Sequence, residues 1–372
     1  MPAPPLQDRD PRREYDQARQ TCPVQRQAGK VVVYGHPEVT EVVTQPELFS
    51  SAVSRFRQLP NGLDGAEHQQ WRALTDPYLM DPENLREVEH LARQVMREVL
   101  GGLTLPATVE AVSDLGARYA VRVQLRWLGW QADLEGQLLD WVQENRRASR
   151  SGDHAWTGRV AEAFDAIIRG ELARRRGQER DDVTARLMNE QVSGRPLQDE
   201  ALVSVLRNWT SGDLGSLALC AGVIVAFLAE HAEVQARLRA GVTPQEFDAA
   251  LDEILRMDDP FVANRRVALR DTRLGGVAVA RGEVVQVNWT AANRDPRVFA
   301  DPDAFCPAKH APDNLVYGLG PHACPGRALS TLELRVFTEE LLRATHSVTW
   351  GAQGTRELPP GGGYATVVVR LA

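Results

Sequence analysis

The sequence YGLGPHACPG at residues 317–326 sets a single cysteine in a glycine-rich turn. Two glycines precede Cys324 and a Pro-Gly pair follows it, so the backbone can bend tightly and then open into a helix from Arg327. A sulfur at a helix N-terminus lies near unpaired N–H groups and the positive end of the helix dipole. Such an environment stabilises a thiolate, which ligates iron or attacks an electrophile. A lone cysteine is more often a small buried apolar residue, so the residues around it decide between these interpretations.

The spacing aromatic-Gly-x-Gly-x-His-x-Cys-x-Gly resembles the haem-binding loop of the cytochrome P-450 family of haem-thiolate monooxygenases. The residues that carry the resemblance are Tyr317 (more often phenylalanine in the family), Gly318, Gly320, His322, Cys324 and Gly326. Pro325 stands where leucine or isoleucine is more usual, and proline is tolerated in the first turn of a helix. The resemblance implies that Cys324 is the axial ligand of haem b (iron protoporphyrin IX), with Tyr317, Gly318, His322 and Gly326 beside the haem.

Composition predicts one large domain without nucleic-acid or membrane partners. The chain has 372 residues, 43% of them hydrophobic, and a net charge of −7 that argues against nucleic acid. The longest apolar stretch, 217–228, is shorter than the roughly 20 residues of a membrane span, and the polar, proline-rich start is neither a signal peptide nor an anchor. Four cysteines without paired spacing suit a reducing cytoplasm. We therefore expect a cytoplasmic protein with a flexible segment over 1–21 and a single domain over 22–372.

Hydrophobic periodicity predicts a mainly α fold with a small β region. Helices are expected over 36–48, from 67, and over 83–100, 109–128, 134–147, 156–176, 199–230, 244–257 and 328–344. Strands are expected over 30–34 and 261–269, and 361–369 is expected to be a glycine turn that leads into a strand. The resemblance implies the triangular haem-thiolate fold. It also implies that the loop 49–65 covers the substrate pocket and that 134–147 and 156–176 form a mobile lid.

Three further residues are candidates for binding the haem propionates. The i,i+4 spacing places His68 and Arg72 on one helix face, which from spacing alone is more often a solvated face. The family has His-x-x-x-Arg here, and the resemblance implies that both side chains bind a propionate. Arg266, six residues after Pro260, matches a second propionate-binding arginine, with Arg265 as a rival one residue away.

The stretch NWTSGDLGS at 208–216 departs from the family. The family's central helix carries an Ala/Gly-Gly-x-Asp/Glu-Thr motif whose acid and alcohol deliver protons. Alignment on Gly212 puts Leu214 at the acid position and Gly215 at the alcohol position. Asp213, Thr210 and Ser216 are then the candidate catalytic residues, acting through ordered water.

A Glu-x-x-Arg string, Glu253 to Arg256, resembles the family's buried ion pair. Four other pairs in the chain share this spacing, and most such pairs are surface contacts. Glu253 is singled out because Pro260 and a strand follow it in the family's order, and Arg294 is expected to be the third member of its network.

The resemblance implies a monooxygenase that inserts one atom of dioxygen into a small hydrophobic organic substrate. Because the chain carries no flavin or iron–sulfur segment, electrons are expected from a ferredoxin or flavodoxin and an NAD(P)H-dependent reductase, docking on the cysteine side near Arg327. Two alternatives stay open. One is a hydrogen-peroxide-driven peroxygenase or peroxidase, which the missing acid–alcohol pair suggests, and the other is a haem-binding sensor or carrier without turnover.

Overall fold

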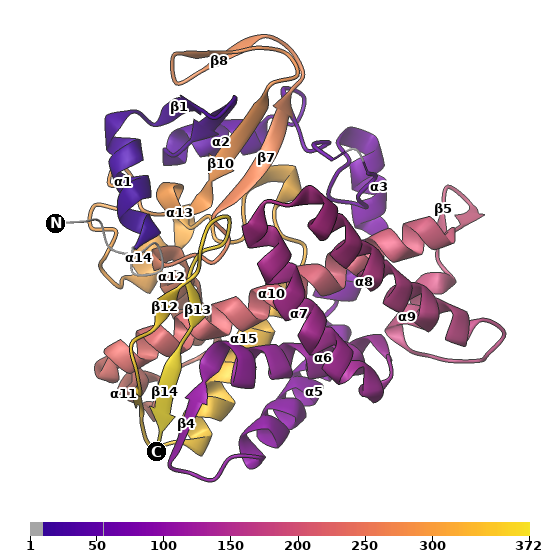
Figure 1. The fold of residues 1–372 in the computed structure, drawn as a ribbon, viewed down its shortest axis with the longest axis vertical. Helices are drawn as coiled ribbons and strands as arrows, with labels where there is room; N and C mark the ends of the chain where they lie inside the picture. The colour runs from indigo at the N-terminus through magenta and orange to yellow at the C-terminus, as the bar shows by residue number, and fades with distance from the viewer. Residues whose placement is uncertain (1–9, 55) are drawn as a thin grey trace.

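Helices form most of the fold, and five strands form one sheet at its edge (Figure 1). The structure is a computed structural model that describes residues 10–54 and 56–372. The helices are α1 Pro11–Thr21, α2 His36–Thr44, α3 Gly65–Thr75, α4 Pro77–Met80, α5 Pro82–Gly101, α6 Arg118–Leu128, α7 Glu135–Ser151, α8 His154–Arg175, α9 Val183–Met188, α10 Asp199–Glu230, α11 Ala232–Ala240, α12 Pro244–Met257, α13 Trp289–Ala292, α14 Pro307–His310 and α15 Arg327–Ala344.

The strands are short and belong to several small sheets. They are β1 Val24–Gln27, β2 Lys30–Val33, β3 Phe49–Ser50, β4 Ala107–Glu110, β5 Gln191–Val192, β6 Arg195–Pro196, β7 Ala263–Ala268, β8 Thr272–Leu274, β9 Val277–Val279, β10 Val284–Asn288, β11 Val348–Trp350, β12 Thr355–Arg356, β13 Tyr364–Thr366 and β14 Val368–Leu371. The five-stranded sheet has the order β1-β2-β10-β7-β3. A fold that is mainly α with a small β region is as predicted.

Helix α10 forms the centre of the helical body, where α6, α8, α12 and α15 contact it. Among the helices of the described residues, α10 alone is long and apolar enough to cross a membrane by length and composition, and 67% of its most apolar window is buried in the protein. Its apolar character is therefore that of a core helix.

Local sequence signals explain where several of the helices begin. Helix α12 starts with a capping box, in which Thr243 and Glu246 bond each other's backbone N–H groups, and Pro244 occupies the first turn. Helix α5 starts at Asp81, whose carboxylate accepts from the N–H groups of Glu83 and Asn84. Helix α15 follows Gly326 directly, so the cysteine loop leads into it, as predicted.

The Glu253–Arg256 pair is buried, but its third member is not the predicted one. Arg256 donates to both carboxylate oxygens of Glu253 at 2.7 and 3.0 Å. The Nδ1 atom of His310 lies 2.6 Å from the Glu253 carboxylate, and the backbone N–H of Cys306 donates to it at 3.0 Å. The prediction that Arg294 joins this carboxylate is wrong, because Arg294 instead pairs with Asp16 at 3.0 Å and with Asp303 at 2.8 Å.

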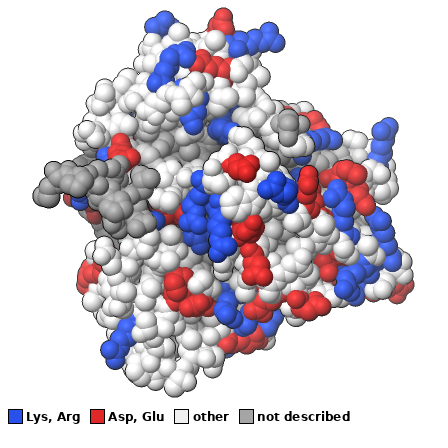
Figure 2. Space-filling view, viewed as in Figure 1, with Lys and Arg blue, Asp and Glu red and all other residues white. Residues whose placement is uncertain are grey.

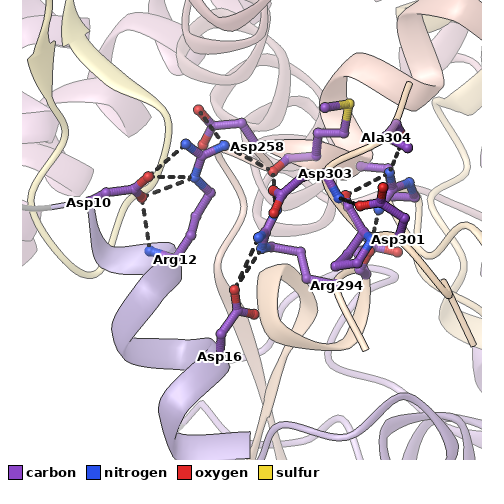
Figure 3. Close-up of polar contacts among 12 residues, drawn as sticks. Asp10, Arg12, Asp16, Asp258, Arg294, Asp301, Asp303 and Ala304 are labelled. Atoms are coloured by element: carbon purple, nitrogen blue, oxygen red, sulfur yellow. Dashed lines mark hydrogen bonds and ion pairs between the residues drawn. The ribbon is translucent and has the colours of Figure 1, made fainter. Parts of the chain in front are cut away.

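Helix α1 is tied to the body by charged side chains (Figure 3). Arg12 pairs with Asp10 at 2.6 Å and donates to the carbonyl of Met257 at 3.2 Å, and Asp16 accepts from Arg294. The prediction of a flexible segment over 1–21 is therefore wrong for Pro11–Thr21, while residues 1–9 lie outside the described residues.

The helix predicted over 109–128 begins later than expected. Val109 belongs to β4, which pairs with β14, and a π-helix over Ala111–Ala117 precedes α6.

Charged side chains of both signs are interspersed on the face drawn in Figure 2, with a group of basic side chains near its centre. Some of the basic side chains of the fold are already neutralised by buried acids. Arg146 and Arg150 of α7 pair with the buried Glu357 at 2.6 and 3.1 Å. These contacts connect α7 to the segment that precedes β13.

Candidate active site

A cavity of about 350 Å³ lies where α10, β7, α15 and the loop 317–326 meet. Its polar lining includes Cys324, Arg72, Arg266 and Asp213, and its apolar lining includes leucines and tryptophans of α4, α6, α10 and α15. The cavity is thus an apolar chamber with a small number of charged groups, which is the usual form of a cofactor or substrate site.

The loop before α15 presents the Cys324 thiol to this cavity. The N–H of Cys324 donates to the carbonyl of Tyr317 at 2.8 Å, which closes the turn. Gly318 and Gly320 have φ angles of 69° and 76°, a conformation that other residues rarely adopt, and a Cβ on Gly320 would lie 2.6 Å from the carbonyl oxygen of Val43. The thiol itself is exposed. Because it lines the cavity, this exposure is toward the cavity.

Burial raises the pKa of the Cys324 thiol, and a hydrogen bond from the backbone at Gly326 acts in the opposite direction. The helix N-terminus therefore assists the thiolate, as the sequence predicts, but does not outweigh desolvation. A bound cation would favour the thiolate directly.

The two predicted histidines lie against each other. The rings of His68 and His322 have centroids 4.2 Å apart, and Nε2 of His322 is 3.0 Å from the Asp64 carboxylate. Burial and the neighbouring His68 lower the pKa of His322 to about 4, and burial also lowers the pKa of His68. Both rings are therefore neutral at physiological pH. His322 lines the cavity, whereas His68 is buried behind it.

The two predicted arginines also reach the cavity. Arg72 donates to Asp76 at 2.6 and 2.7 Å and to the carbonyls of Pro321 and Ala323 at 3.1 and 3.2 Å, so it supports the cysteine loop. Arg266 is 6% exposed and donates to the Arg265 carbonyl at 2.9 Å. Neighbouring side chains of β7 point to opposite faces, so Arg266 lines the cavity and Arg265 faces the exterior.

Arg266 provides a test of whether the site fits a haem. Within the part of the chain that the structure describes, no carboxylate forms an ion pair with this buried guanidinium. Burial lowers its pKa, which the negative charge of Asp64 only partly opposes. A buried cation without a partner is costly, so an anionic group of a ligand would stabilise it. A thiol, a buried arginine and neutral imidazoles around one apolar chamber fit an iron porphyrin with carboxylate side chains.

The α10 candidates separate into two groups. Asp213 and Ser216 line the cavity together with Gly212. Thr210 is not among the lining residues that the structure describes, and its hydroxyl donates to the Leu206 carbonyl. Leu214, at the family's acid position, is fully buried in the hydrophobic core, and a Cβ on Gly215 would meet nothing within 4 Å.

The carboxyl group of Asp213 on α10 has a pKa near neutral pH. Burial raises its pKa to about 7, although hydrogen bonds from Gln124 and Ser330 act in the opposite direction. A carboxyl group with such a pKa can hold or release a proton at neutral pH.

Several lining residues were not identified from the sequence. They are Gln124 and Trp127 of α6, Ser330 of α15, and Asp259 and Asn264 at the start of β7. Their place depends on packing between distant segments. The signal that was available for Ser330 was its position one turn after Gly326 on the same helix.

Comparisons with known proteins agree with this geometry. A family model described as cytochrome P-450 matches residues 246–349. Linalool 8-monooxygenase of Pseudomonas putida is 27% identical over 341 residues, which cover 84% of this chain and 82% of that protein. Erythromycin C-12 hydroxylase of Saccharopolyspora erythraea is 27% identical over 325 residues, covering 83% and 80%. The solved structure of a mutant of P-450 EryK in complex with erythromycin B has a TM-score of 0.87 and 24% identity, covering 97% of this chain and 95% of that one.

Proposed function

We propose that the chain is a cytochrome P-450 monooxygenase that oxidises a small hydrophobic organic substrate with one atom of dioxygen. The family model and the relatives of 27% identity support this proposal. The observation that supports this most strongly is the exposed Cys324 thiol in one cavity with Arg266, Arg72 and His322. That set provides one iron ligand and a cluster of donors for carboxylates.

Haem b, when bound, supplies the oxygen chemistry, and a thiolate ligand favours cleavage of the O–O bond. Cys324 would hold the iron, and Arg266 would bind a propionate as the partner that its buried charge lacks. Neutral His322 and His68 would donate N–H groups on the same side. Arg72 would act on the cysteine loop as well, through the carbonyls of Pro321 and Ala323.

The rest of the cavity wall favours an apolar substrate. Leu79, Trp127, Leu217 and Phe261 contribute to its lining from four different elements or loops. Desolvating an apolar molecule against such a surface is favourable by about 25 cal/mol per Å². The relatives act on molecules as different as linalool and erythromycin by their names, so they support the reaction class and not a particular substrate.

The source of electrons and the location in the cell are part of the proposal. We infer separate redox partners, a ferredoxin or flavodoxin with an NAD(P)H-dependent reductase, and a cytoplasmic enzyme. Arg327, at the start of α15 beside the cysteine loop, has a side chain that is 63% exposed while it pairs with Asp252 at 3.1 Å. It is therefore accessible to an acidic partner on the cysteine side.

The binding of carbon monoxide to the reduced protein tests the proposed iron ligand. Thiolate ligation gives a strongly red-shifted Soret band, which Cys324→Ala should abolish. Cys220→Ala is the matched control, because Cys220 is the other cysteine that lines the cavity and should leave the band in place. Loss of the band in the control variant and its retention in Cys324→Ala would reverse the assignment.

A peroxide-driven enzyme is the second candidate, and the burial of Leu214 in the core beside Gly215 is the observation that favours it. A monooxygenase should form product in proportion to the NAD(P)H consumed when surrogate ferredoxin and reductase are supplied. Hydrogen peroxide alone should give slower conversion of the same substrate. Faster conversion with peroxide would establish the second candidate instead.

A further inference from the structure

Two consecutive acids, Asp258 and Asp259, follow helix α12 and have opposite surroundings. The carboxylate of Asp258 accepts hydrogen bonds from Arg356 at 2.5 and 2.6 Å and lies 3.7 Å from a guanidinium nitrogen of Arg12 (Figure 3). Asp259 instead lines the cavity, is 1% exposed and forms no ion pair with any residue that the structure describes. One of the two carboxyl groups is therefore neutralised inside the protein, and the other is not.

The side chain of Asp259 has one occupied and one vacant oxygen. Its Oδ1 atom accepts from the backbone N–H of Phe261 at 2.7 Å, which closes a turn ahead of β7. Its Oδ2 atom has no hydrogen-bond partner among the described residues. The turn requires a single acceptor, which asparagine or serine would provide without a charge. Because a buried acceptor without a donor is unfavourable, the second oxygen indicates a donor that comes from outside the chain.

The backbone beside this oxygen is fixed from two sides. The N–H of Gly362 donates to the Pro260 carbonyl at 3.0 Å, and the N–H of Trp289 donates to the Val262 carbonyl at 2.8 Å. A Cβ on Gly362 would lie 2.5 Å from the carbonyl oxygen of Asp259, so the glycine turn packs directly on this residue. Asp259 therefore belongs to a well-supported part of the cavity wall, as a recognition group requires.

The other charged groups of the cavity do not supply the missing donor. Arg72 pairs with Asp76 at 2.6 Å, and Arg266 is assigned to a haem propionate. Burial and the negative charge of Asp258 raise the pKa of Asp259 well above its ordinary value, which the hydrogen bond from Phe261 only partly opposes. An ionised Asp259 thus requires a positive charge that the ligand brings.

The lining of the cavity is aromatic as well as apolar. Phe261, two residues after the acid, lines the cavity and is 47% exposed, and Trp127, Trp209 and Trp289 contribute further rings. The faces of aromatic rings attract cations, whereas a carboxylate of a ligand gains nothing from them. An apolar chamber with several aromatic rings and an acid without a cation fits a hydrophobic molecule that carries an ammonium group.

We propose that Asp259 is a specificity-determining residue and that the substrate is a hydrophobic molecule with a basic amine, whose ammonium N–H donates to the Oδ2 atom of Asp259. The inference rests on the proposed function and names the substrate class of the same cavity. When the ammonium form binds, the acid becomes ionised and its proton passes to solvent. The ion pair then provides Asp259 with the counter-charge that Arg356 provides to Asp258.

Titration of the ferric, haem-loaded protein with three matched probes tests the proposal. The probes share a phenylbutyl chain and end in a dimethylamino, an isopropyl or an acetyl group. A shift of the iron from low to high spin reports entry into the cavity. In Asp259→Asn the dissociation constant of the amine should rise about 10- to 100-fold, through loss of a charge-assisted hydrogen bond, while that of the isopropyl probe should stay unchanged.

Two further variants separate recognition from folding. Asp259→Ser keeps an acceptor for the Phe261 N–H and should reproduce the selective loss of amine affinity. Asp258→Asn is the matched control, since it makes the same change one residue away in an acid that Arg356 already engages, and it should leave the ratio of amine to isopropyl affinity unchanged. Equal losses for both probes in the Asp259 variants would assign this acid a structural role.

Other results would overturn the proposal directly. Tighter binding of the acetyl probe than of the amine would show that a protonated Asp259 donates to an acceptor. Coordination of the amine to iron, which gives the opposite spin shift, or no response to the amine at all would also count against it.

The proposed function can fail or stand independently of this inference. Calorimetry with the same probes measures binding to the cavity without any oxygen chemistry. If the wild type shows the carbon monoxide band and coupled turnover, but amine binding does not depend on Asp259, the amine site is refuted and the monooxygenase stands. If the band is absent and calorimetry still shows amine binding that Asp259→Asn weakens, the proposed function fails and the amine site stands.

Discussion

Removal of the Glu253 carboxylate should unfold the protein or deprive it of haem, because it leaves a buried cation without a partner. Arg256 and Glu253 are 0% and 1% exposed as side chains and form two hydrogen bonds at 2.7 and 3.0 Å. In Glu253→Ala the guanidinium keeps its carbonyl partners, Asn293 at 2.7 Å and Pro302 at 3.0 Å, but loses its only ion-pair partner among the described residues.

The expected loss is about 3–5 kcal/mol, the usual effect of removing one member of a buried pair. Two further contacts raise it toward the upper end of this range. The N–H of Cys306 and the ring of His310 lose their acceptor as well, and a hydrogen bond to a charged group is worth about 1.5–3 kcal/mol. A total stability of about 5–15 kcal/mol leaves little margin for such a loss.

Denaturant unfolding of the haem-loaded protein, followed by circular dichroism and by the Soret band, measures the effect. Glu83→Ala is the matched control, since Glu83 and Arg86 have the same i,i+3 spacing but are both exposed, and it should change stability by less than about 0.5 kcal/mol. Equal stability of Glu253→Ala and the control, with normal haem content in both, would refute the reasoning from burial.

Four other outcomes are expected. Arg266→Leu should speed haem dissociation about 10- to 100-fold, through loss of a charge-assisted hydrogen bond of about 1.5–3 kcal/mol, while Arg265→Leu should leave the rate unchanged in the same haem-transfer assay. Deletion of residues 1–21 should lower the denaturation midpoint, because it removes Asp16, the partner of Arg294, and Arg12, which donates to the Met257 carbonyl, and an unchanged midpoint would contradict these contacts. Asp16→Asn should lower the stability by about 1–2 kcal/mol, and in a double-mutant cycle Arg294→Leu should reduce that difference to the part contributed by the second partner of Asp16, Arg19. Burial would raise the pKa of Glu253, but hydrogen bonds from Arg256, Cys306 and His310 lower it below 4.5. The ionised carboxylate therefore stabilises the folded protein, and the stability difference between wild type and Glu253→Gln should shrink as pH falls below about 4.5.

The sequence was most informative where a signal is local. The glycine turn before Cys324, the periodic pattern over 244–257 and the apolar run of α10 are each contained within one segment, and the structure has the predicted helices α15, α12 and α10 there. Arg266 was preferred to Arg265 for its distance from Pro260, and alternation of the strand predicts only that the two side chains point to opposite faces. The family resemblance could supply roles for these residues, but not their contacts.

The predictions that failed depend on partners far along the chain. Asp16 of helix α1 accepts a hydrogen bond from Arg294, which lies 278 residues away in the sequence. The polar composition of the segment gives no sign of this contact, and for that reason it suggested a flexible segment. Val109 lies in a strand because β14, at the other end of the chain, pairs with it. His310 completes the Glu253 network across 57 residues, and no spacing rule singles it out. Charge and strand pairing at such separations are properties of the assembled fold.

Asp213 lies one residue before the position of the family's acid, which Leu214 occupies. An acid displaced by one residue cannot be assumed to take over the role of the acid in the motif. One residue rotates a side chain by about 100° around a helix, so Asp213 and Leu214 face different surroundings. Leu214 enters the core, whereas Asp213 reaches Gln124 of α6 and Ser330 of α15. Ser216, three residues further along α10, lines the cavity as Asp213 does. Burial between these helices raises the pKa of Asp213 to about 7, so the packing of this carboxyl group against α6 and α15, and not its place in the sequence motif, lets it hold a proton near neutral pH.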